Sequence, residues 1–277
     1  MSPTRPPKQK APALTCDCHF HIFGPYDTFP LSAGSTYDPP PALVLDYLAM
    51  AETVGIQRMV VVQASVSGTD NAVTLDAVRQ FGQHRARAVA VIDAGFTDAM
   101  LKQMHAAGVR GVRFNLSSGN GTPIEQLEPI ARRLAPLGWH IQVYTEGETL
   151  AAMAPTLAGL PVPIVIDHCG GVKAGLGPRH PQFHALLGLL DSGNAWIKIC
   201  SYRVSSTGHP WADPAPNVKA FVARYPERCV WGTDWPHPQM SPLPEAGLLL
   251  DQFFEWVPDA ATRHRILVDN PAKLYGF

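Results

Sequence analysis

The sequence has no excess of charge of either sign. Its 277 residues include 22 Lys and Arg against 23 Asp and Glu, for a formal net charge of −1, and charged residues make up 16% of the chain. Proteins that bind nucleic acid or an anionic membrane through charge are strongly basic, so neither is expected as a partner. No uninterrupted apolar run approaches the roughly 20 residues that cross a bilayer, so no membrane span is expected.

Cysteine and targeting signals are also scarce. There are five cysteines, and the closely spaced Cys16 and Cys18 lack the second pair that a cysteine zinc site needs. We interpret all five as free thiols of a protein in the reducing cytoplasm. The opening residues, MSPTRPPKQKAPA, contain basic residues but no apolar stretch, so they do not form a signal peptide. They predict a disordered arm over 1–13, followed by one domain over 14–277.

Hydrophobic residues are abundant, at 46% of the chain, which is enough for a substantial core. Many of them gather in eight short β-branched runs, separated by segments with helical spacing. Runs dense in Val and Ile are typical of strands that are buried on both faces, as in parallel sheets. The eight runs cover residues 15–23, 58–65, 86–94, 109–116, 140–146, 163–170, 195–201 and 228–234.

The segments between these runs include predicted helices over 41–55 and 122–138. The second opens with Thr122 as the capping residue and Glu125 completing a capping box, and it ends at Gly138. Strands that alternate with helices pair in parallel, and eight such units predict a single-domain α/β fold, the (β/α)8 TIM barrel. The alternative, a doubly wound open sheet, needs a glycine-rich phosphate turn after the first strand, and FHIFGP is not one.

Polar side chains stand where the predicted strands end. In a barrel the functional groups lie at these C-terminal ends and in the loops that follow them, and polar groups there are costly unless paired or used. Structural alternatives stay open, since Arg113 and Arg203 can form salt bridges and His237 can hold its proline-rich loop. We predict one site formed by His19, His21, Ser65, Arg113, Tyr144, His168, Arg203, Asp234 and His237.

The stretch CDCHFHIFGP carries two of these residues, His19 and His21. Because side chains alternate along a strand, both are expected to share one face with Asp17, with Cys18 and Phe20 on the other face. The pattern alone fits metal ligands, substrate clamps or hydrogen-bonded core residues.

The long loop over 26–41, after the first strand, is rich in aromatic side chains. Tyr26, Phe29 and Tyr37 all lie in it. They are expected either to form a lid or wall over the site or to pack as an ordinary loop.

With these residues in order, the sequence resembles the amidohydrolase superfamily. The signature is His19-Phe20-His21, His168 in IDHCGG and Asp234 in WGTDWPHP. Together with QASVSGTDN and GVRGVRFNL, these stretches look most similar to the branch that contains 2-pyrone-4,6-dicarboxylate lactonase and related sugar-acid lactone enzymes. The resemblance covers the chain from about residue 15 to 240. It implies a (β/α)8 barrel enzyme, a cytoplasmic hydrolase acting on a cyclic ester.

Two positions depart from the metal-dependent members of that superfamily. Those members carry a bridging Lys on strand four and a His on strand five, where this sequence has Arg113 and Tyr144. His19, His21 and Asp234 can supply three metal ligands, but a nearby guanidinium opposes a divalent cation. The branch resembled here is described as metal-free. We therefore expect no metal, no other cofactor, and histidines that act as substrate clamps.

The chemistry that the resemblance implies is hydrolysis of a carboxylate-bearing lactone similar to 2-pyrone-4,6-dicarboxylate. Asp234 would activate water as general base. His19, His21 and His168 would donate hydrogen bonds to the carbonyl oxygen as it gains negative charge. Substrate contacts, with the two arginines gripping carboxylates, are expected from Ser65, Arg113, Tyr144, Arg203, His237 and Tyr37.

Three other interpretations stay open. The chain could be a zinc-dependent decarboxylase or lactonase of the same superfamily, or an isomerase that moves an acyl group between the hydroxyls of a sugar acid. From a different class, it could bind small anionic metabolites without turnover, although Asp234 beside three histidines is an arrangement that a binder does not need. The sequence leaves the exact lactone and the oligomeric state open.

Overall fold

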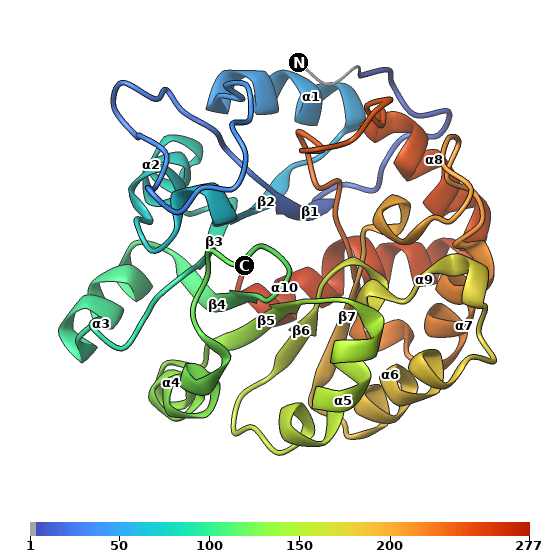
Figure 1. Ribbon diagram of the computed structural model, residues 1–277. Coiled ribbons are helices and arrows are strands. Elements are labelled where there is room, and N and C mark those ends of the chain that lie inside the picture. Colours follow the sequence, from blue (N-terminus) through green and yellow to red (C-terminus); the bar gives the residue numbers. More distant parts are fainter. Residues whose placement is uncertain (1–3) are drawn as a thin grey trace.

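A computed structural model describes residues 4–277 as one eight-stranded parallel sheet curved into a barrel, with helices around it (Figure 1). The strands pair in sequence order. The last meets the first where Asp234 N donates to His19 O at 2.7 Å and His21 N donates to Trp235 O at 2.8 Å. The predicted (β/α)8 barrel is confirmed. Its strands are β1 (Cys16–Phe20), β2 (Arg58–Val62), β3 (Ala86–Ala90), β4 (Val109–Asn115), β5 (His140–Tyr144), β6 (Ile164–Ile166), β7 (Ala195–Ile199) and β8 (Cys229–Trp231).

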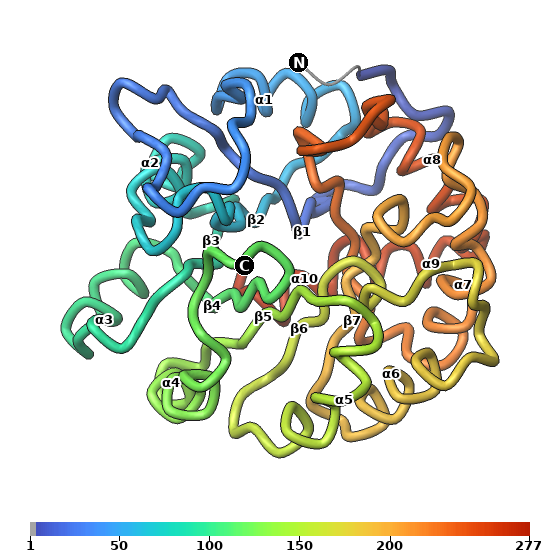
Figure 2. The backbone as a smooth tube through the Cα atoms, in the orientation of Figure 1, coloured from blue at the N-terminus to red at the C-terminus, as the bar shows by residue number. Residues whose placement is uncertain are grey.

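A helix follows each strand, and two short helices extend the chain beyond the eighth unit. The tube in Figure 2 shows this last segment, with α10, lying behind the strands. There Tyr275 of α10 is buried in a cluster with Cys16 and Cys18 of β1, and all five cysteines are buried and free. The helices are α1 (Val44–Val54), α2 (Ala72–Phe81), α3 (Asp98–Ala106), α4 (Leu127–Leu134), α5 (Gly147–Ala158), α6 (Pro181–Asp191), α7 (Ala215–Arg224), α8 (Ala246–Trp256), α9 (Ala260–His264) and α10 (Asn270–Tyr275).

The start of the predicted helix over 122–138 is wrong. Thr122 does not cap it, because its hydroxyl is buried and donates to the carbonyl of Ile92 at 2.5 Å. The segment begins instead with a single 3-10 turn over Ile124–Gln126, and α4 follows. Its predicted end is confirmed, since Gly138 adopts a φ of 66°, a left-handed conformation that glycine tolerates without strain.

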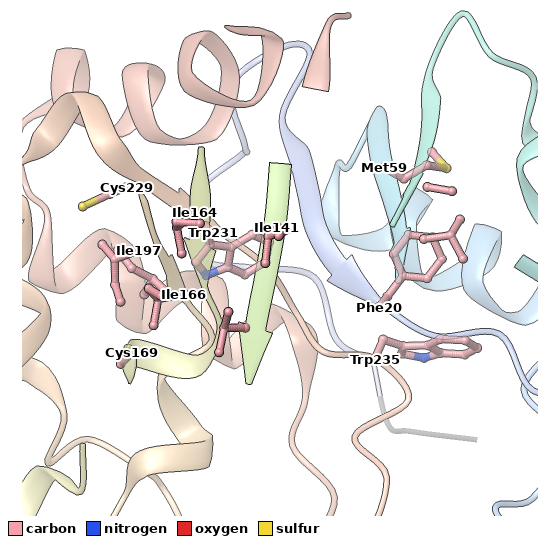
Figure 3. Close-up of a cluster of buried hydrophobic side chains, with 14 of the residues drawn as sticks. Phe20, Met59, Ile141, Ile164, Ile166, Cys169, Ile197, Cys229, Trp231 and Trp235 are labelled. Atoms are coloured by element: carbon pink, nitrogen blue, oxygen red, sulfur yellow. The ribbon is translucent and has the colours of Figure 1, made fainter. Parts of the chain in front are cut away.

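The main core lies between the outer face of the barrel and the helices. Figure 3 shows part of it, where Phe20, Met59 and Trp235 lie together and isoleucines of β5, β6 and β7 pack around Trp231. A second cluster fills the inside of the barrel and includes Val60, Val62, Val89, Val165 and Val230. The outer face of the strands is apolar, and the inner face is apolar apart from buried polar residues such as Arg113, Gln142 and Lys198, which explains why the strands read as largely hydrophobic runs.

A β-bulge in β1 corrects the predicted faces of that strand. The pairing runs from Asp17 opposite Met59 to Phe20 opposite Val61, so three residues of β1 span two of β2. Asp17 consequently lies on the outer side, where its carboxylate accepts hydrogen bonds from the Thr233 hydroxyl at 2.6 Å and from Tyr47 at 3.2 Å. The extra residue brings His19 to the inside of the barrel.

The predicted disordered arm over 1–13 falls partly outside the described residues, which begin at residue 4. The described part of the arm lies against helix α8. Arg5 is 2.9 Å from a carboxylate oxygen of Asp251, and a Cβ at Gly247 would lie 2.1 Å from the Arg5 carbonyl oxygen. The glycine thus leaves room for the arm. No helix within residues 4–277 is both long and apolar enough to cross a membrane.

Candidate active site

A cavity of about 480 Å³ opens at the C-terminal ends of the strands, where a barrel of this type places its functional groups. Its wall also contains polar residues that the sequence argument did not select, among them Asn115, Ser117 and Glu146. Asn115 ends β4, and Ser117 and Glu146 lie on the loops after β4 and β5, where side chains give no periodic signal. Eight of the predicted residues line the cavity, namely His21, Tyr37, Ser65, Arg113, Tyr144, His168, Arg203 and Asp234.

Asp234 is buried at the floor of this cavity, directly after β8. Its Oδ2 accepts hydrogen bonds from Arg203 Nε at 2.5 Å and from the Tyr202 hydroxyl at 2.6 Å. Its Oδ1 faces two imidazole nitrogens, His21 Nε2 at 3.4 Å and His19 Nε2 at 3.6 Å. Burial alone would raise the pKa of Asp234, but the Arg203 guanidinium, together with the surrounding histidines, outweighs burial and holds the pKa well below its usual value. The carboxylate is therefore ionised at neutral pH.

Two histidines of the floor differ in their surroundings. His21 Nδ1 lies 2.8 Å from the carbonyl oxygen of Val62, and because a carbonyl only accepts, Nδ1 carries the proton. His168 follows β6 with a φ of 48°, and its ring lies 4.7 Å from that of Tyr144. Burial lowers the pKa of His168 to about 4, so its imidazole is neutral at neutral pH.

His19 and His237 do not line the cavity. Both side chains are fully buried, and His19 lies beneath the floor, behind Asp234. His237 Nδ1 is 3.3 Å from the Tyr202 hydroxyl, so it supports the residue that holds Asp234. Neither is placed to touch a substrate in the cavity, which differs from the contacts that we expect from sequence.

Beneath the floor lies a network of buried polar groups that the sequence argument missed. Lys198 of β7 is fully buried, and its Nζ lies 2.7 Å from Gln142 Oε1, 3.1 Å from Asp167 Oδ1 and 3.2 Å from His19 Nδ1. Asp167 Oδ2 accepts from Gln142 at 2.9 Å and from Arg113 at 3.2 Å. Burial raises the pKa of Asp167, but the neighbouring Lys198 and His19 outweigh it and hold the pKa well below the usual value. The one sequence feature that indicates this network is a single lysine, Lys198, inside the otherwise apolar run AWIKIC.

Two arginines connect the cavity to these carboxylates. Arg113 pairs with Asp167, as its structural alternative allowed, and also lines the cavity with its guanidinium 5.5 Å from the centre of the Tyr144 ring. Arg203 pairs with Asp234, which raises the pKa of the arginine further. With Lys198, three cations thus face Asp167 and Asp234, and Glu146 adds a third carboxylate at the cavity wall.

The loop over 26–41 supplies one wall of the cavity through Thr36 and Tyr37. The Tyr37 hydroxyl is hydrogen-bonded to Ser65, and burial raises the pKa of Tyr37. Asn120, from the loop after β4, donates to the carbonyl oxygen of Ser65 at 2.6 Å. The predicted aromatic wall is therefore present at Tyr37 and is tied to two neighbouring loops.

Two sets of side chains offer three metal-ligating atoms within 4.8 Å of one another. One is His19, His21 and Asp234; the other combines His19 with Asp167 and His168. A metal-bound histidine normally donates its second N–H to an acceptor. His21 does so, but the Nδ1 of His19 faces the ammonium of Lys198, which has no lone pair to accept a proton. Both sets contain His19, so a divalent cation at either would lie close to the buried ammonium of Lys198; Asp167 Oδ1, 3.3 Å from His19 Nδ1, is the nearby atom that can accept the second N–H.

Comparison with known proteins assigns a family to this arrangement. A model of the amidohydrolase family matches residues 16–277. The chain is 37% identical to a 2-pyrone-4,6-dicarboxylate hydrolase of Comamonas testosteroni, over 97% of this chain and 92% of that protein. It is 36% identical to a 4-sulfomuconolactone hydrolase of Rhizobium radiobacter, over 94% and 89% of the two chains. It is 33% identical to a D-galactarolactone isomerase of Agrobacterium fabrum, over 97% and 93%.

Solved structures agree with these matches. A protein of Agrobacterium tumefaciens in its apo form superposes with a TM-score of 0.89 at 32% identity, covering 98% of each chain. A probable 2-pyrone-4,6-dicarboxylic acid hydrolase of Acinetobacter baumannii, with citric acid bound, gives 0.85 at 27% identity, over 95% of this chain and 100% of the other. Both likenesses extend over nearly the whole barrel.

Proposed function

Since the chain belongs to the amidohydrolase family, we propose that it hydrolyses a lactone that carries one or more carboxylates, a compound of the kind of 2-pyrone-4,6-dicarboxylate. One observation carries the proposal. Asp234 stands ionised in the floor of a cavity lined by two arginines, with one oxygen anchored by Arg203 and Tyr202 and the other facing His21. The lactone hydrolases among the relatives support the same class of reaction.

Asp234 Oδ1 is the general base in this mechanism. It takes a proton from a water molecule as the water oxygen forms a bond to the lactone carbonyl carbon. The tetrahedral intermediate then collapses, the ring C–O bond breaks, and the proton on Asp234 returns to the leaving oxygen. Because Arg203 keeps the pKa of Asp234 low, the carboxylate is a weak base and part of the barrier must be lowered elsewhere.

The negative charge that develops on the carbonyl oxygen is stabilised by His168 and by the guanidinium of Arg203. Both line the cavity beside Asp234. A neutral imidazole donates through one nitrogen only, and His168 Nδ1 has no hydrogen-bond partner among residues 4–277. Loss of one such donor typically costs about 3 kcal/mol in the transition state.

The carboxylates of the substrate are held by the remaining N–H groups of the two arginines. Arg113 and Arg203 each use Nε on a protein carboxylate, which orients the terminal nitrogens of the guanidinium toward the cavity. A guanidinium matches a carboxylate with two parallel hydrogen bonds. Tyr37, Ser65 and Tyr144 supply neutral polar contacts along the same wall.

We further propose that this hydrolysis needs no metal ion. The guanidinium of Arg203 already neutralises Asp234, and a dication between them would compete with it at short range. Lys198 adds a second cation beneath the floor. The positive charge that polarises the carbonyl is thus supplied by side chains of the chain itself.

The test is turnover of 2-pyrone-4,6-dicarboxylate by chelator-treated protein, followed by loss of the pyrone absorbance and by proton release. Hydrolysis liberates an acid, so we expect about one proton for each ring opened. Activity that appears only after Zn²⁺ or Mn²⁺ is added back would contradict the metal-free mechanism. Failure with this and other carboxylated lactones under all conditions would contradict the proposed function.

An isomerase is the second candidate, favoured by the 33% identity to a D-galactarolactone isomerase. Moving an acyl group between two hydroxyls consumes no water and releases no proton. Incubation of a sugar-acid lactone in H₂¹⁸O separates the two reactions, because only hydrolysis places the label in the carboxylate of the product.

A further inference from the structure

Lys198 is a buried cation to which the proposed mechanism gives no contact with the reacting groups. It is fully buried on β7, the strand that faces His19 across the inside of the barrel. Its Nζ lies within 3.2 Å of three acceptors, Gln142 Oε1, Asp167 Oδ1 and His19 Nδ1. An ammonium carries three N–H donors and no acceptor, so these three partners match its full donor capacity.

This match decides which nitrogen of His19 carries the proton. A hydrogen bond from Lys198 requires a lone pair on His19 Nδ1. Asp167 Oδ1 is also close to Nδ1, at 3.3 Å, and the hydrogen bonds that Asp167 accepts from Gln142 and Arg113 both end on its Oδ2. A proton on Nδ1 directed at Oδ1 would leave the ammonium of Lys198 facing an N–H at 3.2 Å, donor against donor, whereas a lone pair on Nδ1 leaves Lys198 free to donate to both atoms. The orientation of Gln142 agrees, since its amide donates to Asp167 and its oxygen accepts from Lys198.

We propose that Lys198 is a positioning residue that holds His19 as the Nε2–H tautomer, aimed at Oδ1 of Asp234. His19 Nε2 lies 3.6 Å from that oxygen, beyond hydrogen-bond length, so its N–H acts electrostatically on the carboxylate oxygen that receives the proton from water. The role of this contact in catalysis rests on the proposed function; the tautomer itself does not.

The same arrangement keeps metal ions out of the site. With the proton on Nε2, His19 offers no lone pair toward Asp234 and His21, and the three-ligand set loses one member. Lys198 also places a positive charge next to that set. Removing the ammonium frees His19 Nδ1 to donate to Asp167 and turns the Nε2 lone pair toward His21 and Asp234, an arrangement that binds a divalent cation.

The first test uses the unaltered protein. ¹⁵N NMR of histidine-labelled protein separates protonated from unprotonated ring nitrogens, and the His19→Gln variant identifies the His19 signals. We expect a protonated Nε2 and an unprotonated Nδ1. The opposite tautomer, or a doubly protonated ring at neutral pH, overturns the proposal whether or not any lactone is hydrolysed.

The second test compares Lys198→Met with Lys219→Met, a control at an exposed position of α7. We expect Lys198→Met to lower kcat by about 10²-fold with little change in KM, and the control to match the original protein. Titration with Co²⁺ should give visible absorption bands at one ion per chain in Lys198→Met and none in the original protein. Unchanged kcat in a folded Lys198→Met variant, or stoichiometric Co²⁺ in the original protein, overturns the proposal.

These outcomes are distinguishable from failure of the proposed function. Should no lactone be turned over, the His19 tautomer and the Co²⁺ titration still report on Lys198. Should Lys198→Met not fold, the tautomer in the unaltered protein remains decisive.

Discussion

Arg203 Nε lies 2.5 Å from Oδ2 of Asp234, so the group proposed to grip the substrate also holds the group proposed to activate water. Binding and base strength are coupled through this pair. A substrate carboxylate that approaches the guanidinium shares its charge, which weakens the hold on Asp234 and makes the carboxylate a stronger base when the substrate is present.

Replacing Arg203 with Met is expected to damage both steps. Loss of the substrate contact raises KM, and loss of the charge beside Asp234 raises the pKa of that carboxyl, because burial then dominates. The acidic limb of the kcat/KM profile should move to higher pH, and kcat/KM at neutral pH should fall by about 10²-fold or more. Arg224→Met, at an exposed ion pair on α7, is the control. An acidic limb that stays in place would show that Arg203 does not set the base.

Replacing Asp234 with Asn removes the base and retains its shape. We expect kcat to fall by about 10²- to 10⁴-fold, the range of general base catalysis, while substrate binding measured by calorimetry changes little. The exposed Asp191→Asn variant on α6 should behave as the unaltered protein does. Turnover by Asp234→Asn at more than a tenth of the original rate would assign the base to another residue.

Asp17 predicts a pH dependence of stability that is independent of catalysis. Burial raises its pKa from 3.8 to about 6, so the folded state binds a proton more tightly than the unfolded chain does. The stabilisation from that proton is complete below pH 3.8, and it is lost as pH rises through about 6; the shift corresponds to about 3 kcal/mol. In urea unfolding, the difference in unfolding free energy between the original protein and Asp17→Asn should therefore decrease from pH 4 to pH 7. A constant difference would show that Asp17 titrates normally.

The barrel and most of the cavity wall could be predicted from sequence because two regularities coincide. Parallel strands buried on both faces leave continuous apolar runs, and their C-terminal ends all meet at one rim. A polar residue at the end of such a run, such as Arg113 or His168, is therefore placed at the rim without knowledge of any contact.

What the sequence could not supply depends on contacts between distant strands. The bulge that moves Asp17 outward is fixed by pairing with β2 and by Thr233, neither of which leaves a local signal. Lys198 looks like a solvated strand residue until Gln142, in the middle of β5, and Asp167, just after β6, are placed around it. Because simple alternation puts His19 on the same face as Asp17, and only the bulge separates them, the depth of His19 was also missed.

Substitutions of His168 distinguish an effect on catalysis from an effect on stability. Its φ of 48° is one that Asn and Gly adopt readily, so His168→Asn and His168→Gly both remove the imidazole without adding backbone strain. If His168 donates to the developing oxyanion, both variants should lose about 10²- to 10³-fold in kcat with nearly unchanged KM. Their thermal stability should stay near that of His84→Asn, a control at an exposed position.

Because the neutral imidazole of His168 is the donor, kcat should not fall as the pH rises from 6 to 8, where a histidine with a pKa of about 4 does not titrate. A loss confined to KM would instead assign His168 to substrate binding, and a loss in the same pH range would require a protonated ring.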